Sequence, residues 1–291
     1  MGFRYYREED YEAVCDFLIE LNRAEKACIN WNWARFEWMY EHPEFDKSLI
    51  RSIGIWTDSD RVVGAAVYDM YFGEAFCAAL PGYEALYPEI LDYAWTHLRD
   101  ENGLGIAIRA DQSGMIAAAV KAGFVRAEQR EIIMSLSTDR ELEPELPDGM
   151  RFIELDPVAQ SHEFQWLLWQ GFDHGNDREE FKKQESDIKY NRRHFDLRLS
   201  VAAQDPSGET AAYCCLWYSE KTDYTYVEPV CTVPSYRGKG VAKAVIFEAL
   251  NRARALGAKR AYVISDMAFY EKLGFEKTYR FDFYWKKEET K

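Results

Sequence analysis

The feature that most constrains the fold of this chain is an internal repeat. Residues 2–6 (GFRYY) resemble residues 149–153 (GMRFI), and residues 121–124 (KAGF) resemble residues 272–275 (KLGF). The first pair of segments lies 147 residues apart and the second pair 151 residues apart, so one register with few gaps relates the two halves. This register indicates an internal duplication of a mixed α/β unit.

The segment between the two copies has the composition of a linker. Residues 139–148 are charged, contain Pro144 and Pro147, and show no apolar periodicity. We therefore expect a first domain at residues 1–138, a linker at 139–148 and a second domain at 149–291. A chain of 291 residues with 47% hydrophobic residues is long enough to form two domains with sizeable cores.

Hydrophobic periodicity predicts the elements of both copies. In the first copy we expect strands at residues 2–6, 50–56, 61–68 and 104–109, helices from residue 9, at 87–98 and at 114–121, and a last strand ending near 136. In the second copy we expect strands at 149–153, 197–203, 210–218, 224–232, 259–265 and 275–285, and helices at 158–169, 241–256 and 267–273. The aromatic patch at residues 31–40 favours core packing, with an acceptor-site wall as the alternative.

Charge and cysteine content narrow the range of partners. A net charge of −14 and a pI near 5.0 argue against nucleic-acid or acidic-membrane partners and are compatible with a cationic substrate. The six cysteines form no C-x-x-C pair and have no histidine at zinc spacing, so we expect no metal and read Cys214 and Cys215 as buried thiols. No signal peptide or membrane span is evident, so we expect a cytoplasmic protein.

A glycine-containing loop follows the strand expected at residues 224–232. Gly238 and Gly240 allow the backbone to turn sharply and to approach a ligand closely. The helix expected after them would direct its unpaired N–H groups and its positive dipole end into the loop, which favours an anion such as phosphate. The alternative is a turn that merely requires glycine. Pro229 cannot donate a ladder hydrogen bond, so we expect an edge, a bulge or a splayed strand end there.

Two motifs flank the helix expected at residues 241–256. Arg237, Gly240 and Ala242 fill the pattern Gln/Arg-x-x-Gly-x-Gly/Ala, which here follows the tripeptide Pro-Ser-Tyr at residues 234–236. Residues 269–275 then read Phe-Tyr-Glu-Lys-Leu-Gly-Phe. In this order the motifs resemble those of the GNAT N-acetyltransferase superfamily. The resemblance covers residues 149–285 well and the first copy in outline. It implies two tandem GNAT domains, each a mostly antiparallel twisted sheet with a splayed central strand pair flanked by helices.

The resemblance also implies how the second domain would hold acetyl-coenzyme A. Backbone amides of the loop would bind its pyrophosphate, and the free edge of the preceding strand would pair with its pantetheine amides. Ser265 and Asp266 stand where many members carry an Asn near the pantetheine. The residues expected to contact the coenzyme are Val230, Cys231, Thr232, Val233, Tyr236, Arg237, Gly238, Lys239, Gly240, Val241, Ala242, Ser265, Asp266 and Tyr270.

Two residues are candidates for proton transfer. By resemblance, Tyr270 would protonate the departing coenzyme A thiolate, a role that suits a phenol whose pKa is close to that of a thiol. The alternative is that Tyr270 packs beside Phe269 and Phe275. The amine acceptor must lose a proton, and Glu228 is our candidate base because it precedes the splayed strand end. The alternative is that Glu228 is a solvated strand carboxylate.

The first copy departs from the motif at the positions that would bind the pyrophosphate. Alignment on the tripeptides Pro-Gly-Tyr at residues 81–83 and Pro-Ser-Tyr at 234–236 places Glu84, Tyr87 and Glu89 opposite Arg237, Gly240 and Ala242. Two carboxylates and a bulky ring would repel a pyrophosphate and fill its space. Ala119 lies opposite Tyr270. We therefore expect a degenerate first domain that does not bind coenzyme A productively.

We expect an acyltransferase that moves an acetyl group from acetyl-CoA to a primary amine of a small molecule by direct attack. The acidic run Phe172, Asp173, His174, Asp177, Glu179 and Glu180 would suit a cationic acceptor, or it is a solvated helix face. Two alternatives remain: a tandem amide synthase acting on a small thiol or amino-sugar acceptor, and a non-catalytic acyl-CoA sensor or assembly module. The sequence leaves monomer and homodimer open.

Overall fold

The computed structural model describes residues 1–42, 45–184 and 193–288. The chain divides into two compact units. The first unit contains the described parts of residues 1–134, 264–270 and 277–291, and the second contains those of 135–263 and 271–276. Residues 138–150, which include the expected linker at 139–148, form no helix or strand. Asn251 exchanges two hydrogen bonds of 2.9 Å with the backbone of Leu142 in this segment. The predicted domain limits stay a prediction.

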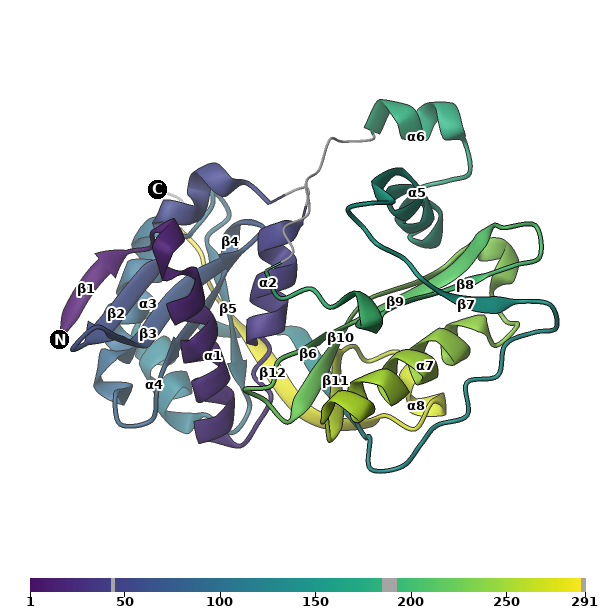
Figure 1. Cartoon of the computed structure of the whole chain (residues 1–291). Coiled ribbons are helices and arrows are strands. Elements are labelled where there is room, and N and C mark those ends of the chain that lie inside the picture. The colour runs from purple at the N-terminus through teal and green to yellow at the C-terminus, as the bar shows by residue number, and fades with distance from the viewer. Residues whose placement is uncertain (43–44, 185–192, 289–291) are drawn as a thin grey trace. The chain divides into compact units, whose positions relative to one another are not determined.

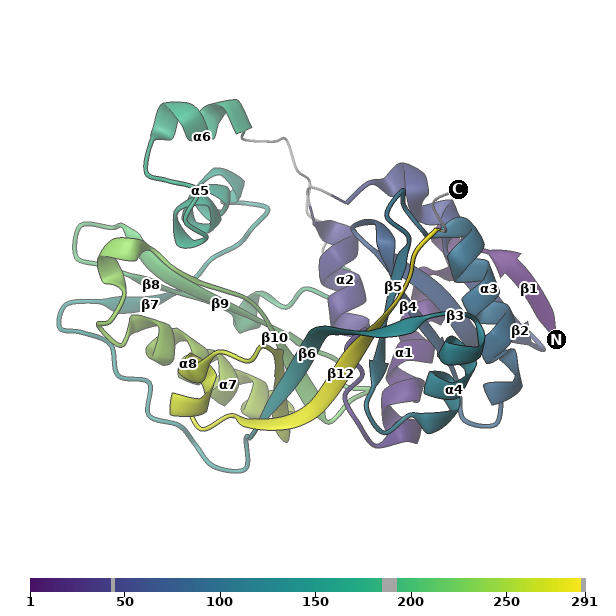
Figure 2. The ribbon, with the colours of Figure 1, turned by 180° about the vertical axis from the view of Figure 1, so that it is seen from behind.

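The first unit is a mixed sheet with helices on both faces. Its strands lie in the order β1-β2-β3-β4-β5-β12-β6. Figures 1 and 2 show α1 and α2 on one face of this sheet and α3 and α4 on the other. Its elements are β1 (Gly2–Tyr5), α1 (Tyr11–Glu25), α2 (Trp33–Glu41), β2 (Gly54–Asp58), β3 (Arg61–Asp69), β4 (Tyr71–Ala79), α3 (Tyr87–His97), β5 (Leu104–Arg109), α4 (Ser113–Lys121), β6 (Val125–Ser137) and β12 (Glu276–Lys286).

The second unit repeats this arrangement. Its strands lie in the order β11-β10-β9-β8-β7, with α5 and α6 on one face and α7 on the other (Figure 1). Its elements are β7 (Arg151–Glu154), α5 (Ser161–Gly171), α6 (Arg178–Gln184), β8 (Ser200–Gln204), β9 (Thr210–Tyr218), β10 (Tyr224–Thr232), α7 (Val241–Leu256) and β11 (Arg260–Ile264). The residues of α8 (Ala268–Lys272) are divided between the two units. The order strand, two helices, three strands, helix, strand, helix, strand occurs twice, which confirms the predicted duplication and the mixed α/β class.

The last strand of the chain belongs to the sheet of the first unit. β12 pairs antiparallel with β5, from Phe281 opposite Arg109 to Lys286 opposite Leu104. Gly105 makes room for this strand, because a Cβ built on it would lie 2.6 Å from the Trp285 ring. The ion pair between Arg126 on β6 and Asp282 on β12 measures 2.8 Å. The second copy therefore contributes its final strand to the sheet formed by the first.

Most of the expected elements are present, and several details differ. β4 was not expected, because its sequence YFGEAFCAA does not alternate between apolar and polar residues. The strand expected at 50–56 begins later, since Lys47–Ser52 forms a 3-10 helix and β2 starts at Gly54. Likewise Leu197–Leu199 forms a 3-10 helix before β8. The aromatic patch at 31–40 is core packing as predicted, since Trp31, Trp33 and Phe36 are buried.

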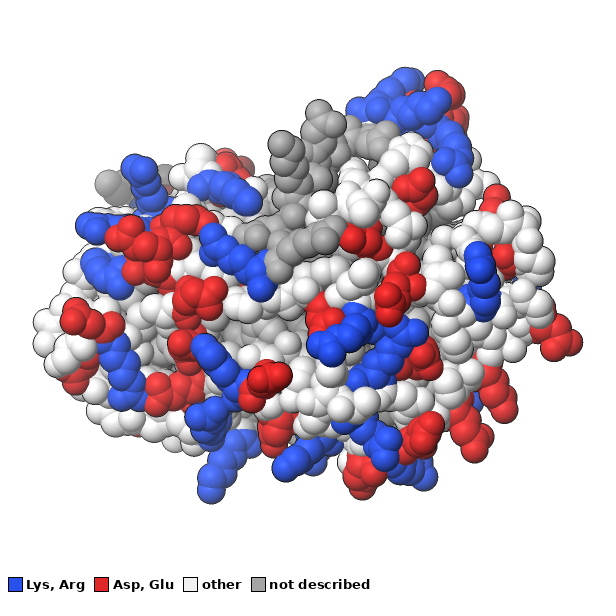
Figure 3. Space-filling model, in the orientation of Figure 1, with Lys and Arg blue, Asp and Glu red and all other residues white. Residues whose placement is uncertain are grey.

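The structure shows where the charged side chains and the cysteines of the sequence lie. Acidic and basic side chains are interspersed over the face shown in Figure 3. Among the described residues, no helix combines the length and the apolar character that a membrane span requires. Cys214 and Cys215 are buried free thiols, as predicted, and burial raises the pKa of Cys215 to about 12.

Candidate active site

The candidate phosphate loop connects β10 to α7 in the second unit. A 3-10 turn at Pro234–Tyr236 follows the strand, and Gly238 and Gly240 then adopt φ angles of 75° and 83°. Positive φ is the region that glycine enters most readily, so both positions depend on the absence of a Cβ. A Cβ built on either glycine would meet no atom within 4 Å, so the space beside the loop is open.

The N–H groups of this loop are candidate donors to an anion. Those of Tyr236 and Arg237 donate to the carbonyls of Val233 and Pro234 at 2.9 and 3.2 Å. From Gly238 through Ala242, by contrast, the N–H groups donate to no acceptor in the described part of the chain. Five successive donors at the N-terminus of a 16-residue helix, where the positive end of the dipole lies, favour a phosphate-type anion.

Arg237 is partly exposed, and its guanidinium makes three contacts that fix the loop. Its Nε donates to the carbonyl of Thr232 at 3.0 Å, and its Nη2 donates to the carbonyl of Gly171 at 2.9 Å. Its Nη1 also lies 2.9 Å from a carboxylate oxygen of Asp173. The guanidinium therefore ties the end of β10 to the C-terminus of α5, where Gly171 itself packs within contact of Cys231. Sequence reasoning identified Arg237 but not this bracing role.

The strand before the loop has a free edge. β10 pairs in parallel with β11 only from Tyr224 to Tyr226. Its register to β9 shifts between Val227 and Val230, which confirms the irregularity predicted at Pro229. Beyond the shift, the strand continues to pair with β9 through Thr232 opposite Ala212. On the side of β11, the backbone of Val230–Thr232 is therefore available to an extended ligand.

Glu228 lies at this bulge and is half-buried. Its backbone carbonyl accepts a hydrogen bond of 2.8 Å from Nε1 of Trp217, which holds the bulge in place. Burial and a neighbouring strand irregularity are compatible with a proton-transfer role. That role stays a prediction.

The segment that carries Tyr270 is grouped with the first unit. The Tyr270 side chain is buried, and its ring lies 5.1 Å from that of Phe269. The N–H of Ser265 donates to the carbonyl of Ile132, and its Oγ accepts from the N–H of Met267 at 3.2 Å. Asp266 is exposed. The acid role of Tyr270 and the coenzyme contacts of Ser265 and Asp266 stay predictions.

The acidic run between α5 and α6 is partly used by the fold. Asp177 accepts from the N–H groups of Glu179 and Glu180 at the start of α6, at 2.8 and 3.3 Å. Glu179 forms an ion pair of 2.8 Å with Lys182, and Asp173 pairs with Arg237. His174 lies against the Trp169 ring at 5.0 Å, and Phe172 is exposed. These contacts favour the interpretation that the acidic residues begin α6 and hold the loop through Arg237.

The matching position in the first unit is blocked by its own side chains. There the Glu84 carboxylate accepts the N–H of Gly82 at 3.0 Å, and this bond lowers its pKa. Glu89 accepts from Nε1 of Trp56 at 2.8 Å. Tyr87 is half-buried, and desolvation raises its pKa to about 12. The Glu84 carboxylate therefore already accepts a backbone N–H of this turn, and its charge would repel a phosphate.

The gap between the splayed strands of the first unit is also filled. β4 and β5 pair in parallel only at Glu74–Gly105 and Ala75–Ile106. Beyond that point Glu25 accepts from Gln112 at 3.1 Å and pairs with Arg109 at 2.7 Å. The remaining cavity measures about 40 Å³, against roughly 300 Å³ for the smallest ordinary ligand site. The space left between these strands is therefore smaller than that of an ordinary ligand site.

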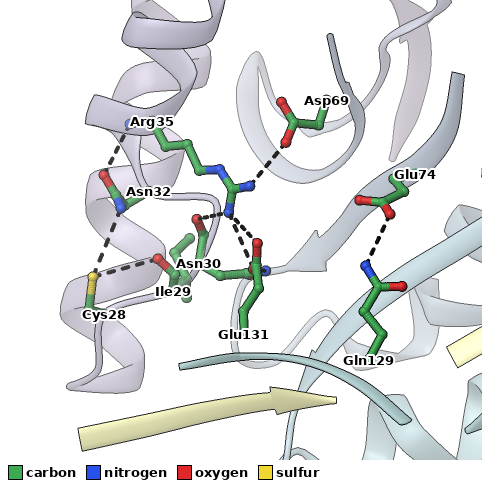
Figure 4. Close-up of polar contacts among 9 residues, drawn as sticks. All are labelled: Cys28, Ile29, Asn30, Asn32, Arg35, Asp69, Glu74, Gln129 and Glu131. Atoms are coloured by element: carbon green, nitrogen blue, oxygen red, sulfur yellow. Dashed lines mark hydrogen bonds and ion pairs between the residues drawn. The ribbon is translucent and has the colours of Figure 1, made fainter. Parts of the chain in front are cut away.

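A polar network closes the other end of these strands (Figure 4). Arg35 on α2 reaches between the carboxylates of Glu131 and Asp69, at 3.1 and 3.0 Å. Its guanidinium also lies 4.9 Å from the Phe76 ring. Beside it, Gln129 donates to Glu74 at 3.2 Å, and burial raises the pKa of Glu74. Sequence reasoning missed this network, because its members come from four separate elements.

Comparison with known proteins agrees with this geometry. The family model described as "Acetyltransferase (GNAT) family" matches residues 161–275. A tandem GNAT protein from the clavulanic acid biosynthesis pathway is similar at 16% identity and a TM-score of 0.65, covering 100% of this chain and 99% of that one. A GCN5-related N-acetyltransferase from Sphaerobacter thermophilus is similar at 15% identity and a TM-score of 0.62, covering 98% and 95%. A GNAT-family acetyltransferase from Colwellia psychrerythraea is similar at 13% identity and a TM-score of 0.58, covering 99% and 100%. A comparison with curated protein sequences gives no match.

The second unit thus carries a domain of the GNAT acetyltransferase family, and the whole chain has the fold of tandem GNAT proteins. Acyl transfer is the activity that this family membership supports. At these low identities the likeness to solved structures shows the fold alone.

Proposed function

We propose that the second unit binds acetyl-CoA and transfers its acetyl group to a primary amine of a small molecule. The observation that carries this proposal is the row of unpaired N–H donors from Gly238 to Ala242 after a splayed strand. These donors would hold the pyrophosphate, and the dipole of α7 would add to the attraction. Lys239, exposed beside them, would supply a further positive charge.

The pantetheine arm would lie along β10. The two amides of pantetheine would pair with the backbone of Val230–Val233 on the side that faces away from β9. This strand edge is free because β11 pairs with β10 only at residues 224–226. Backbone hydrogen bonds at this edge would place the thioester next to the bulge at Glu228. The family membership of residues 161–275 supports this placement.

The reaction would proceed by direct attack. The amine nitrogen forms a bond to the thioester carbonyl carbon, and the bond between that carbon and sulfur then breaks. The phenol of Tyr270 gives its proton to the departing thiolate. Glu228, directly or through water, takes the proton that the amine nitrogen loses. Holding the two reactants together supplies much of the rate, because it removes the entropic cost of their meeting.

The first unit would take no coenzyme. Glu84 places a carboxylate at the start of α3, and Glu25 with Gln112 fills the gap between β4 and β5. Its sheet contains β12, which follows α8 directly in the chain. We infer that the first unit retains a structural role after losing its own site.

Replacing Tyr270 with Phe tests the proposal. The full chain is assayed with acetyl-CoA and a panel of primary amines by release of free thiol. Tyr270→Phe should lower turnover by about 10²-fold or more, with acetyl-CoA affinity nearly unchanged. Tyr5→Phe on exposed β1 is the matched control and should leave turnover unchanged. Tight acetyl-CoA binding without turnover on any amine would favour the acyl-CoA sensor instead.

A further inference from the structure

A large open groove lies on the second unit, and it shares only Val233 and Tyr236 with the residues expected to contact the coenzyme. It has a volume of about 710 Å³. It is lined by residues of α5 and the start of α6, by Gly208–Thr210 at the β8–β9 turn, and by residues 233–236, which directly precede the candidate phosphate loop. The side chains that carry the argument are His162, Glu163, Trp166, Arg178, Glu209 and Tyr236.

One of the side chains that line this groove, Trp166, already binds a cation. The guanidinium carbon of Arg178 lies 4.5 Å from the centre of the Trp166 ring. Phe181 of α6 packs edge-on against the same ring at 5.2 Å, which fixes its orientation. Trp is the aromatic side chain that attracts cations most strongly, and guanidinium stacks on it well. The face of Trp166 is therefore a cation site occupied by the chain itself.

The walls carry negative charge that the fold does not use. Among the described residues, the carboxylates of Glu163 and Glu209 form no hydrogen bond or ion pair, and both are exposed. Asp173 also lines the groove, but its carboxylate is paired with Arg237. Arg178 is the one Lys or Arg that lines the groove in the described part of the chain. A positively charged ligand would therefore meet unpaired carboxylates on two sides.

We propose that this groove is a binding site for an organic cation, a guanidinium or alkylammonium compound. The cation stacks on Trp166 in exchange with Arg178, and Glu163 and Glu209 supply the countercharge. Binding at this site requires no acyl transfer, so this proposal is independent of the function proposed above. Tyr236 links the two places, because it lines the groove and directly precedes the phosphate loop.

Butylguanidine and its neutral counterpart butylurea test the site by ligand-observed NMR titration of the full chain without coenzyme. Butylguanidine should bind saturably, and butylurea should bind at least about tenfold more weakly because it lacks the charge. Raising the salt from low to about 0.5 M should weaken butylguanidine binding, since exposed charge pairs are screened. Equal binding of the two compounds, or no saturable binding, would overturn the proposal.

If the ligand displaces Arg178 from the Trp166 ring, then removing Arg178 should strengthen ligand binding. Arg178→Ala removes the internal competitor and should tighten butylguanidine binding several-fold, whereas Trp166→Leu should weaken it about fivefold. Glu209→Gln lies on an exposed turn, so it leaves the packing intact and should also weaken binding. Lys182→Ala, on the same helix as Arg178 but not lining the groove, is the control and should have no effect.

Two results would contradict this account. Weaker binding in Arg178→Ala would mean that Arg178 supports the ligand rather than competing with it. Competition for the groove by adenosine 3′,5′-bisphosphate, abolished by Trp166→Leu, would show that it holds the nucleotide end of the coenzyme.

Discussion

The guanidinium of Arg237 donates to the backbone carbonyl of Gly171 at 2.9 Å, across 66 residues of sequence. This bond joins the C-terminal end of α5 to the residue that opens the phosphate loop. It also satisfies a carbonyl that a helix end leaves without an intrahelical partner. The loop is therefore held from outside as well as by its own turn.

Removing this brace should loosen the loop. Arg237→Ala loses contacts to Thr232, Gly171 and Asp173 together, and we expect acetyl-CoA affinity to fall about tenfold, roughly 1.4 kcal/mol. Asp173→Asn is the matched control, since it removes only an exposed ion pair. Such pairs contribute about 0–1 kcal/mol, so its effect should be small. Calorimetric titration measures both, and an equal loss in the two variants would contradict the bracing role.

Substitution of two glycines distinguishes the effect of backbone strain from the effect of a lost ligand contact. Gly240→Ala and Gly208→Ala both place a Cβ at positive φ, at 83° and 91°, in open space. Each should lower the stability of the protein by about 1 kcal/mol. Only Gly240→Ala should also weaken acetyl-CoA binding, because Gly208 lies in the β8–β9 turn. Parallel thermal unfolding and binding measurements check this, and equal binding losses would argue against the phosphate loop.

A carboxylate beside the loop should give the second unit a pH-dependent contribution to stability. Asp205 accepts from Ser207, from Tyr236 at 2.7 Å and from backbone N–H groups, and these bonds lower its pKa to about 2. A group with a lowered pKa stabilises the fold above its ordinary value of 3.8, and this contribution is lost as the pH falls toward 2. The same hydrogen bond raises the pKa of Tyr236 to about 12, so its contribution is present below pH 10 and lost above it.

The difference in melting temperature between wild type and Asp205→Asn reports this contribution. It should be constant from about pH 5 to 8 and shrink below about pH 4. Tyr236→Phe, which removes only one donor, should change the melting temperature in the same direction by less. A difference that grows on acidification would have the wrong sign and would reject the assignment.

Substitution of Gly105 tests the pairing of the last strand, β12, with β5. A Cβ there would lie 2.6 Å from the Trp285 ring, so Gly105→Ala should cost about 1–3 kcal/mol through overpacking. Gly114→Ala in α4 is the control, since its Cβ would lie 3.8 Å from Tyr87 in ordinary contact. That change should stabilise the protein by about 0.5 kcal/mol. Chemical denaturation measures both, and tolerance of Gly105→Ala would contradict the pairing of β12 with β5.

Local sequence signals predicted much of this protein. The spacing of Gly238 and Gly240 before an amphipathic helix predicted the strand–loop–helix connection, because those effects act within a few residues. The anion site at this connection stays a prediction. Pro229 marked the strand irregularity for the same reason. The repeated Gly-Phe pairs gave the duplication. Each of these signals acts within a short segment or recurs at a fixed interval.

What the sequence did not show depends on contacts between distant segments. Nothing local in residues 276–286 indicates that this strand lies in the sheet of the first unit, since any sheet would accept its alternation. The stacking of Arg178 on Trp166 and the bonds of Arg35 to Glu131 likewise require the tertiary fold. β4 was missed because tertiary pairing outweighed its weak strand pattern.

We propose that only the second of the two related units holds acetyl-CoA, and the stoichiometry of binding distinguishes one site per chain from two. Calorimetric titration of the full chain with acetyl-CoA should give one molecule per chain. Gly240→Ala should weaken that binding, while Gly82→Ala, at φ 92° in the matching turn of the first unit, should leave it unchanged. Two molecules per chain, or binding that Gly82→Ala weakens and Gly240→Ala does not, would contradict the account.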